Sequence, residues 1–305
     1  WTAGFFPNML WESYKRRKYL QSSAKYQGEP SLDSWLQQAR AWTDPLITNV
    51  NLTNTHDVGF LSFPFDAALE LDPDRSRANT WLPVLQQMSY NLAARFVPAP
   101  GVIRSWDTNN NSAAMRGSHE DSVLVIIDNM MNLALLARSA FEYTRNHTLL
   151  EIAISHANRT RDHHIRPDGS SFHVCDYSAD TGQLYLCRTA QGLADNSTWA
   201  RGQAWAIYGF VQMYSYTKDP SYLATSLKCA DWFLDRLPAD GVPFWDFDAP
   251  YLPDQTPRDT SAATIAASGL ILLQEQLAGT GFKYAGNRNY QSAAIRLLRD
   301  AISLA

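Results

Sequence analysis

The stretch HEDSVLVIIDNMMNLALLARSA, residues 119–140, is apolar nearly all round a helical wheel, and this pattern predicts a buried helix over 119–140. Asp121, Asp128 and Asn132 would fall on one stripe of that helix. A carboxylate surrounded by hydrocarbon must be paired, hydrogen-bonded or protonated. Burial raises the pKa of a carboxyl, as a general acid near neutral pH requires. Asp128 is therefore either a catalytic acid or a group that bonds a neighbouring helix end.

Helical periodicity continues on both sides of this stretch. The predicted helices cover residues 4–19, 32–47, 58–70, 77–96, 119–140, 147–160, 198–217, 220–236, 259–277 and 288–303. Ser31, Ser118 and Ser197 are the expected N-caps of three of them. No linker rich in Gly, Ser or charge divides the chain. The sequence thus indicates one all-α domain, residues 1–305, built from helical hairpins.

The charge balance excludes several classes of partner. The chain has 30 acidic and 26 basic side chains, a net charge of −4, whereas nucleic-acid binding needs a concentrated basic face. The basic cluster Lys15–Lys18 is typical of a solvated helix face. No apolar run is long enough to cross a membrane, since residues 123–137 are interrupted by Asp128. We expect neither a nucleic-acid nor a membrane partner.

Strand signals occur at residues 102–106 and over 171–189, where Asp180-Thr181-Gly182 predicts the turn of a hairpin. Cys175 and Cys187 lie symmetrically about that turn. In a hairpin they would face each other at bridging distance, and two buried free thiols are the alternative. Five N-x-S/T sequons also occur, where roughly two are expected by chance. They lie at Asn51, Asn110, Asn146, Asn158 and Asn196. Together these features favour a secreted protein over a cytoplasmic one.

Two further charged residues stand in unusual positions. Asp57 precedes the apolar run 58–65, so it is either the N-cap of that helix or a functional carboxylate. Arg201 falls in the first turn of a predicted helix, where the helix dipole disfavours a cation. Such an arginine either binds an anionic ligand in its guanidinium fork or pairs with a structural aspartate.

Metal and cofactor chemistry has no support in the sequence. HExxH, CxxC, Walker and G-x-S-x-G motifs do not occur. His163-His164 and the pair Asp246/Asp248 do not form a recognisable ligand set. We therefore expect no metal and no cofactor.

Several long motifs, in the same order along the chain, resemble those of the unsaturated glucuronyl hydrolases, glycoside hydrolase family 88. They are WTAGFFPNMLW (1–11), THDVGF (55–60), VIIDNMMNLALL (125–136), HIRPDGSSFHVCDY (164–177), STWARGQAWAIYGF (197–210), DGVPFWDFDAP (240–250) and RDTSAATIAASGL (258–270). The resemblance implies an (α/α)6 barrel, a ring of six helical hairpins with the site in its mouth. The family usually carries one more helix before WTAGF and another after residue 305. We therefore expect this chain to lack terminal helices of the barrel.

The resemblance also implies an activity and a set of residues. The family removes a 4,5-unsaturated uronic acid from the non-reducing end of small oligosaccharides left by polysaccharide lyases. Carried over by motif, Asp128 is the general acid and then base, and Asp57 is the second carboxylate. The residues expected to line the sugar pocket are Trp11, His173, Thr189, Gln191, Trp199, Arg201 and Trp205. Two departures are Phe6, where the family often has Trp, and Cys187, in a loop that contacts the sugar in relatives.

The implied chemistry suits these side chains. An unsaturated uronide is a vinyl ether, so protonation at C4 gives an oxocarbenium-like centre at C5, which water then attacks. This differs from glycosidases that act at the anomeric carbon with two carboxylates. Two other interpretations are open: an unsaturated rhamnogalacturonyl hydrolase acting on pectin-derived disaccharides, and a sugar-binding relative that has lost catalysis.

Overall fold

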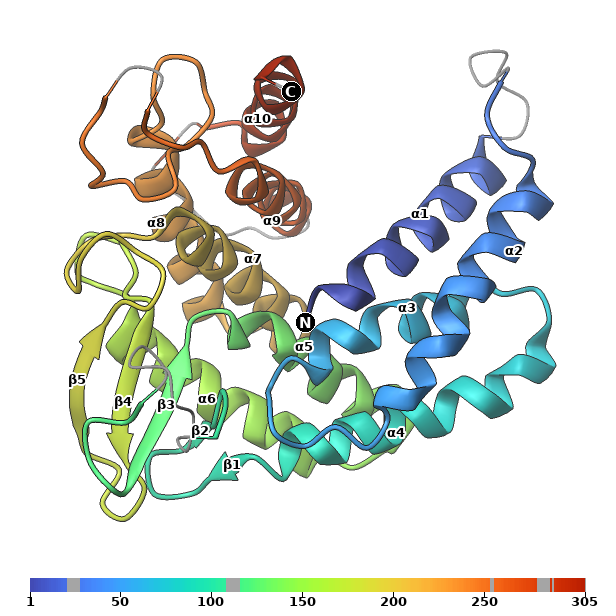
Figure 1. Ribbon diagram of the computed structural model, residues 1–305, viewed down its shortest axis with the longest axis horizontal. Helices are drawn as coiled ribbons and strands as arrows, with labels where there is room; N and C mark the ends of the chain where they lie inside the picture. Colours follow the sequence, from blue (N-terminus) through green and yellow to red (C-terminus); the bar gives the residue numbers. More distant parts are fainter. Residues whose placement is uncertain (21–27, 108–115, 253–254, 279–285, 287, 305) are drawn as a thin grey trace. The chain divides into compact units, whose positions relative to one another are not determined.

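The structure, a computed structural model, describes residues 1–20, 28–107, 116–252, 255–278, 286 and 288–304 (Figure 1). Two compact units are present. The first contains Trp1–Arg95 and Leu135–Leu150, and the second contains Phe96–Ala134 and Glu151–Ala305. Because each unit is assembled from two separate segments, no single cut of the chain divides them. The single domain 1–305 remains a prediction.

The first unit is built from antiparallel helices. They are α1 (Phe5–Tyr19), α2 (Leu32–Thr43), α3 (Val58–Leu71) and α4 (Ala78–Ala93), with short 3-10 turns at Thr2–Gly4, Asp44–Asn49 and Arg75–Arg77. Helix α1 packs on α2 and α3, and α3 packs on α4. Ser31 caps α2 as predicted, because its Oγ accepts a hydrogen bond from the Ser34 amide at 3.1 Å.

The second unit contains α7 (Ala200–Thr217), α8 (Pro220–Asp235), α9 (Thr260–Ala278) and α10 (Tyr290–Leu304). Helix α7 packs on both α8 and α9, and α9 packs on α10 (Figure 1). Most of α6 (Thr148–His164) also belongs to this unit. These bounds agree with the predicted helices within a few residues, except for α6, which continues four residues further. The helix pairs follow the 3.6-residue period read from the sequence.

The predicted helix over 119–140 is wrong in its first half. Ser122–Ile126 form strand β3, and α5 begins only at Asn129 and ends at Arg138, where π-helical residues Ser139–Tyr143 follow. A short apolar run buried on both sides reads the same in a strand and in a helix. The β-branched residues at 123, 125 and 126 favour the strand. Ser118 is therefore not a helix cap.

Strand β3 belongs to an antiparallel three-stranded sheet in the order β3-β4-β5. The hairpin of β4 (Val174–Ser178) and β5 (Leu184–Arg188) confirms the strand prediction for 171–189. Gly182, with φ of +74°, supplies the turn conformation that a side chain would oppose. The signal at 102–106 corresponds to the shorter strand β2 (Val102–Ile103), paired with β1 (Phe96–Val97).

Cys175 and Cys187 are opposite one another in β4 and β5 and form a disulfide. The bridge confirms the first of the two alternatives drawn from the hairpin. Val123, Val125 and Tyr177 surround it in a buried cluster. The disulfide therefore links the outer strand of the sheet to the strand that carries His173 at its start.

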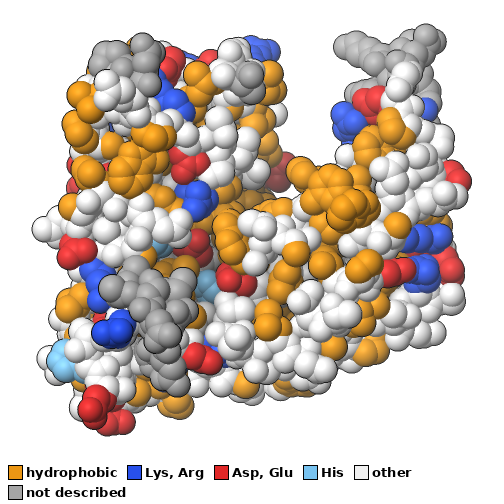
Figure 2. Space-filling model, viewed as in Figure 1, with side chains coloured by type: hydrophobic (Ala, Val, Ile, Leu, Met, Phe, Trp, Pro, Cys, Tyr) orange, Lys and Arg blue, Asp and Glu red, His pale blue; other side chains and the backbone are white. Residues whose placement is uncertain are grey.

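The surface of the first unit has an apolar hollow of about 530 Å³ between the start of α1 and the end of α2. Phe6 and Trp42 stand over it in a T-shaped pair with ring centroids 4.8 Å apart, and Figure 2 shows hydrophobic side chains gathered there. Both rings are about half exposed, at 45% and 55%. None of the helices in the described part of the chain combines the length and hydropathy needed to cross a bilayer.

His164, at the end of α6, ties that helix to the sheet. Its Nε2 lies 3.1 Å from the carbonyl oxygen of Val125 in β3, so Nε2 carries the proton and donates. The ring is completely buried, and this burial lowers the pKa of His164 to about 4. The folded protein therefore holds His164 neutral, whereas the unfolded chain protonates it below about 6.5.

This difference predicts that acid destabilises the protein through His164. Between pH 6.5 and pH 4 the unfolded state binds one more proton at this residue, so stability falls as the pH falls. From pH 6.5 to pH 5 the loss is about 2 kcal/mol for this histidine. Urea unfolding followed by tryptophan fluorescence should show this loss. His164→Gln, whose amide can still donate to Val125, should lose correspondingly less stability over that interval. An identical pH dependence in the two proteins would contradict the assignment.

Candidate functional site

Asp128 lies in the turn between β3 and α5, within the second unit. Its carboxyl is largely buried, with the residue 7% exposed. The predicted stripe of Asp121, Asp128 and Asn132 does not exist, because Asp121 precedes β3. The Asp121 carboxylate instead accepts hydrogen bonds from the hydroxyls of Ser178 and Tyr185, at 2.6 and 2.8 Å. Asn132 is buried one turn further along α5.

His173 faces Asp128 from the residue before β4. Its Nδ1 accepts hydrogen bonds from the backbone amides of Ala190 and Gln191, at 3.1 and 3.3 Å. A nitrogen that accepts two N–H groups carries no proton, so the proton of the neutral ring is on Nε2. That Nε2 lies 4.0 Å from Asp128 Oδ2. A ligand oxygen placed beside the line that joins His173 Nε2 to Asp128 Oδ2 could hydrogen-bond to both side chains.

The His173 ring is neutral. Burial, with smaller contributions from His164 and Arg201, lowers the pKa of His173 to about 3. The ring also lies against the indole of Trp199, with centroids 4.3 Å apart. His173 is thus a fixed N–H donor rather than a proton-exchanging group at neutral pH.

The loop after β5, residues 189–198, carries Thr189 and Gln191. Thr189 Oγ1 accepts the Gly192 amide at 2.7 Å and lies 3.5 Å from His173 Nδ1. A Cβ at Gly192 would lie 2.6 Å from that hydroxyl and 2.8 Å from Asp246 Oδ2, so only glycine fits. Thr189 therefore shapes the loop that supplies the two amides to His173.

Two charged side chains, the buried Asp246 and the half-buried Arg166, hold the same loop in place. Asp246 Oδ2 accepts the Leu193 amide and the Ser197 hydroxyl, at 2.9 and 2.7 Å. Arg166 donates to the carbonyl oxygens of residues 196 and 197 at 3.0 Å, and to Thr198 Oγ1 at 3.1 Å. Neither residue was singled out from the sequence as part of a sugar site. Asp246 was considered only for metal, and its bonds show it organising backbone instead.

The second aspartate of the 246/248 pair also serves the backbone. Asp248 Oδ2 accepts the Thr198 amide at 2.9 Å, just before α7 begins at Ala200. The predicted cap Ser197 does not cap α7, because the helix begins later and its N-cap position is Trp199; the Ser197 hydroxyl donates to Asp246 instead. Within the described ranges, no three His, Cys, Asp or Glu side chains gather as metal ligands.

Arg201, in the first turn of α7, is paired with an aspartate, the second of its two expected roles, and its binding of an anionic ligand stays a prediction. Its guanidinium stands over the Trp199 ring at 4.4 Å and donates to Gln191 Oε1 at 2.8 Å. A carboxylate oxygen of Asp259 lies 3.7 Å from Nη1. The arginine is thus stacked on an aromatic face and paired with an aspartate, with its side chain 21% exposed.

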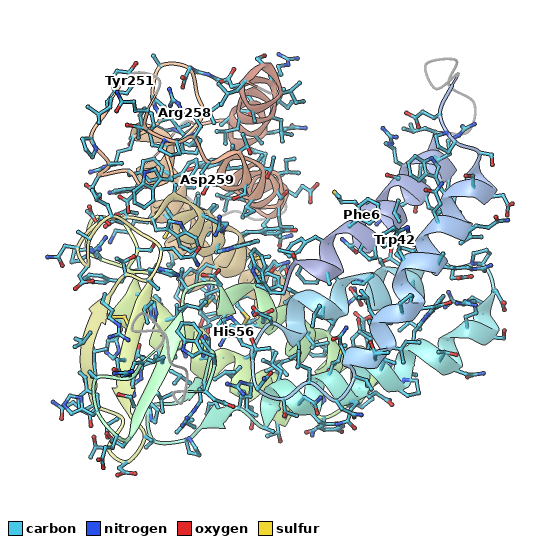
Figure 3. All side chains as sticks on the ribbon, in the orientation of Figure 1. Phe6, Trp42, His56, Tyr251, Arg258 and Asp259 are labelled. Atoms are coloured by element: carbon cyan, nitrogen blue, oxygen red, sulfur yellow. A yellow bond between two sulfur atoms is a disulfide. The ribbon has the colours of Figure 1, made fainter. Side chains whose placement is uncertain are left out.

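Asp259 is a further residue of this site, not predicted from the sequence. It lies directly before α9, where its Oδ1 accepts the Ser261 hydroxyl and the Ala262 amide, at 2.5 and 2.9 Å. Figure 3 labels Arg258 and Asp259 on the segment that leads into α9. The capping signal Asp-Thr-Ser was visible in the sequence. That the other oxygen faces Arg201 could be seen only in the fold.

The predicted aromatic walls have different surroundings. Trp199 and Trp205 are buried in the second unit, at 4% and 2% exposure. Trp11 belongs to the first unit and is completely buried. Its Nε1 donates to Thr43 Oγ1 at 2.9 Å, and its ring packs edge-on against Trp81. The Trp11 ring thus packs as core in the first unit, and its assignment as a sugar-contacting wall stays a prediction.

Asp57 lies in the first unit, immediately before α3. It occupies the N-cap position, but its side chain makes no capping bond, which removes the capping interpretation. The carboxylate instead accepts the Thr55 hydroxyl at 2.9 Å and lies 3.2 Å from Nε2 of the buried His56. His56, labelled in Figure 3, was also missed, although it stands next to Asp57 in the sequence.

The charge state of Asp57 follows from these contacts. Burial alone would raise the pKa of Asp57, but the hydrogen bond and charge of His56 and the hydroxyl of Thr55 outweigh it, so the pKa is lowered. Asp57 is therefore an anion at neutral pH. The two predicted carboxylates thus have unlike environments: Asp128 is enclosed beside a neutral N–H donor, and Asp57 accepts donors that stabilise its negative charge.

Comparison with known proteins identifies relatives over nearly the whole chain. No family model matches it. It is 37% identical over 304 residues to an unsaturated glucuronyl hydrolase of Formosa agariphila, covering 98% of this chain and 67% of that protein. It is 32% identical over 279 residues to an unsaturated glucuronyl hydrolase of Bacillus sp. strain GL1, covering 91% of this chain and 68% of the relative.

Solved structures agree with these matches. A crystal structure of an unsaturated glucuronyl hydrolase specific for heparin superposes with a TM-score of 0.81 at 33% identity, covering 98% of this chain and 72% of the other. The Bacillus sp. GL1 enzyme, described as responsible for the degradation of glycosaminoglycan, gives a TM-score of 0.80 at 28% identity, with 98% and 73% covered. These likenesses confirm the predicted helical-barrel fold class. The chain belongs to the unsaturated glucuronyl hydrolase family.

Proposed function

We propose that this chain is a glycosidase that removes a 4,5-unsaturated glucuronyl residue from the non-reducing end of lyase-generated oligosaccharides. The observation that carries the proposal is the buried carboxyl of Asp128, with the fixed Nε2–H of His173 at 4.0 Å. Gln191 belongs to the loop 189–198 that bonds His173, and Arg201 donates to Gln191. The side-chain N–H groups of these two residues can serve as donors for a uronic-acid carboxylate. The named relatives favour glucuronyl over rhamnogalacturonyl substrates, and the proposal requires no metal or cofactor.

The reaction is a hydration. Protonated Asp128 gives its proton to C4 of the substrate, and the positive charge that develops at C5 is shared with the ring oxygen. Asp128, now a carboxylate, takes a proton from water as the water oxygen bonds to C5. The hemiketal then opens to a ketone at C5, and the hemiacetal left at C1 expels the aglycone as an alcohol.

The other residues have supporting roles in this proposal. His173 donates from Nε2 to a substrate oxygen beside Asp128, and it stays neutral through the cycle because its pKa is about 3. Arg201 binds the substrate carboxylate, with its guanidinium plane held by Trp199. Thr189, Gln191, Trp199 and Trp205 shape the pocket. Asp57 is the second carboxylate, and its low pKa keeps it ionised.

The first test concerns Asp128. Asp128→Asn keeps the shape of the side chain but can neither give nor take the proton, so we expect kcat to fall about a thousandfold. Turnover is followed as loss of the ultraviolet absorbance of the C4=C5 bond in an unsaturated glucuronyl disaccharide. The control is Asp162→Asn, the same change at an exposed aspartate of α6, which should leave kcat unchanged. Near-normal turnover by the Asp128 variant would remove this residue from the chemistry.

The second test separates binding from chemistry at Arg201. Arg201→Lys keeps the positive charge but loses the planar fork and the stack on Trp199, so we expect KM to rise about tenfold. Because the lysine takes no part in proton transfer, kcat should change much less. Arg161→Lys, at a partly exposed arginine of α6 that also lies outside the loop 189–198, is the matched control. A fall in kcat with unaltered KM would show that Arg201 does not hold the substrate carboxylate.

A further inference from the structure

The three cysteines of this chain are in the state expected of an oxidised protein. Cys175 and Cys187 are bridged. The remaining thiol, Cys229, is completely buried in α8, and burial raises its pKa to about 12. A thiol of that kind neither exchanges with disulfides nor reacts. Structural disulfides are rare in reducing compartments and persist where proteins are exported.

The sequons are independent of the cysteines, and the structure distinguishes among them. Asn51 is exposed in the turn after the 3-10 segment Asp44–Asn49, with Thr53, the acceptor-motif threonine, also exposed. The backbone of this turn is held from within the first unit. The Leu52 amide donates to Asn49 O at 3.0 Å, and Asn91 Nδ2 donates to Leu52 O at 3.1 Å. The turn is therefore formed without the Asn51 side chain, which leaves that side chain available for attachment.

Asn158 is the opposite case. It lies inside α6, and its Oδ1 accepts the hydroxyl of Tyr222 at 2.9 Å. Tyr222 is fully buried, so the Asn158 amide group is part of the contact between α6 and α8. A sugar chain on its Nδ2 would have to stand in that contact.

The other three sequons give a weaker contrast in the accessibility of the asparagine side chain. Asn146 is half-buried, and its Oδ1 accepts the Thr148 amide at the start of α6, at 3.1 Å. Asn196 is exposed, but Arg166 holds both its carbonyl oxygen and the hydroxyl of Thr198. Asn110 lies outside the described residues. Asn51 and Asn158 therefore form the clearest contrast.

We propose that this chain is exported through an oxidising secretory compartment and carries an N-linked glycan on Asn51 but none on Asn158. In the attachment step Asn51 Nδ2 bonds to C1 of a lipid-linked oligosaccharide, and the lipid diphosphate leaves from C1. The amide loses one proton as the bond forms. The donor is a polyprenyl diphosphate oligosaccharide of the compartment that also forms the Cys175–Cys187 bridge.

The test uses the protein recovered from the culture medium of the organism that makes it. An amidase that removes N-glycans converts the attached asparagine to aspartate, and mass spectrometry of peptides locates each conversion. We expect conversion at Asn51 and none at Asn158. Asn51→Gln should remove one glycan from the intact mass, whereas the matched Asn158→Gln should remove none. An unmodified Asn51, or a glycan on Asn158, would overturn the assignment.

Thiol labelling tests the compartment separately. In the denatured protein, one cysteine should react before reduction and three after reduction, as the bridge and Cys229 require. Labelling of all three without reduction, in protein found only inside the cell, would overturn export. The glycan result and the thiol result can fail independently, so each part of the proposal is tested by its own measurement.

Discussion

The site in the second unit depends on one constraint, the two backbone amides of Ala190 and Gln191 that donate to His173 Nδ1. Because Nδ1 is occupied as an acceptor, the only proton of the neutral ring is on Nε2, which faces Asp128. The same two bonds attach the loop 189–198 to the start of β4. Burial then lowers the pKa of His173 to about 3, so the ring keeps this state at neutral pH.

That constraint needs a rigid loop, and two charged side chains, the buried Asp246 and the half-buried Arg166, hold the loop through hydrogen bonds. Asp246 accepts from Leu193 and Ser197, and Arg166 donates to the backbone just before α7. A buried charge is costly unless every bond it can make is satisfied, and several of these bonds are to backbone groups that would otherwise be unpaired. Substitution of Asp246 would therefore disturb His173 indirectly, through the loop.

Helix bounds could be predicted most accurately from the sequence where long apolar segments are bounded by turn residues. Helices α1, α3, α8 and α9 begin and end within about two residues of their predicted bounds, because each is a long apolar segment with turn or capping residues at its ends. The helix prediction failed at residues 119–128, where a strand buried on both sides has no alternation to reveal it. The error placed Asp121 beside Asp128, although Asp121 bonds Ser178 and Tyr185 at the other end of β3.

Residue types and motif order, by themselves, determined the mostly helical class, the Cys175–Cys187 hairpin, the family resemblance and the choice of Asp128 and Asp57. These features depend on the spacing of apolar residues along the chain and on the chemistry of individual side chains, both of which can be read from the sequence. Only the tertiary structure decided that Trp11 is core, that Asp259 faces Arg201, and that Asp57 bonds Thr55 and His56 instead of capping α3. The physical reason is that burial, tautomer and hydrogen-bond partner are set by groups brought together in space, often from distant parts of the chain.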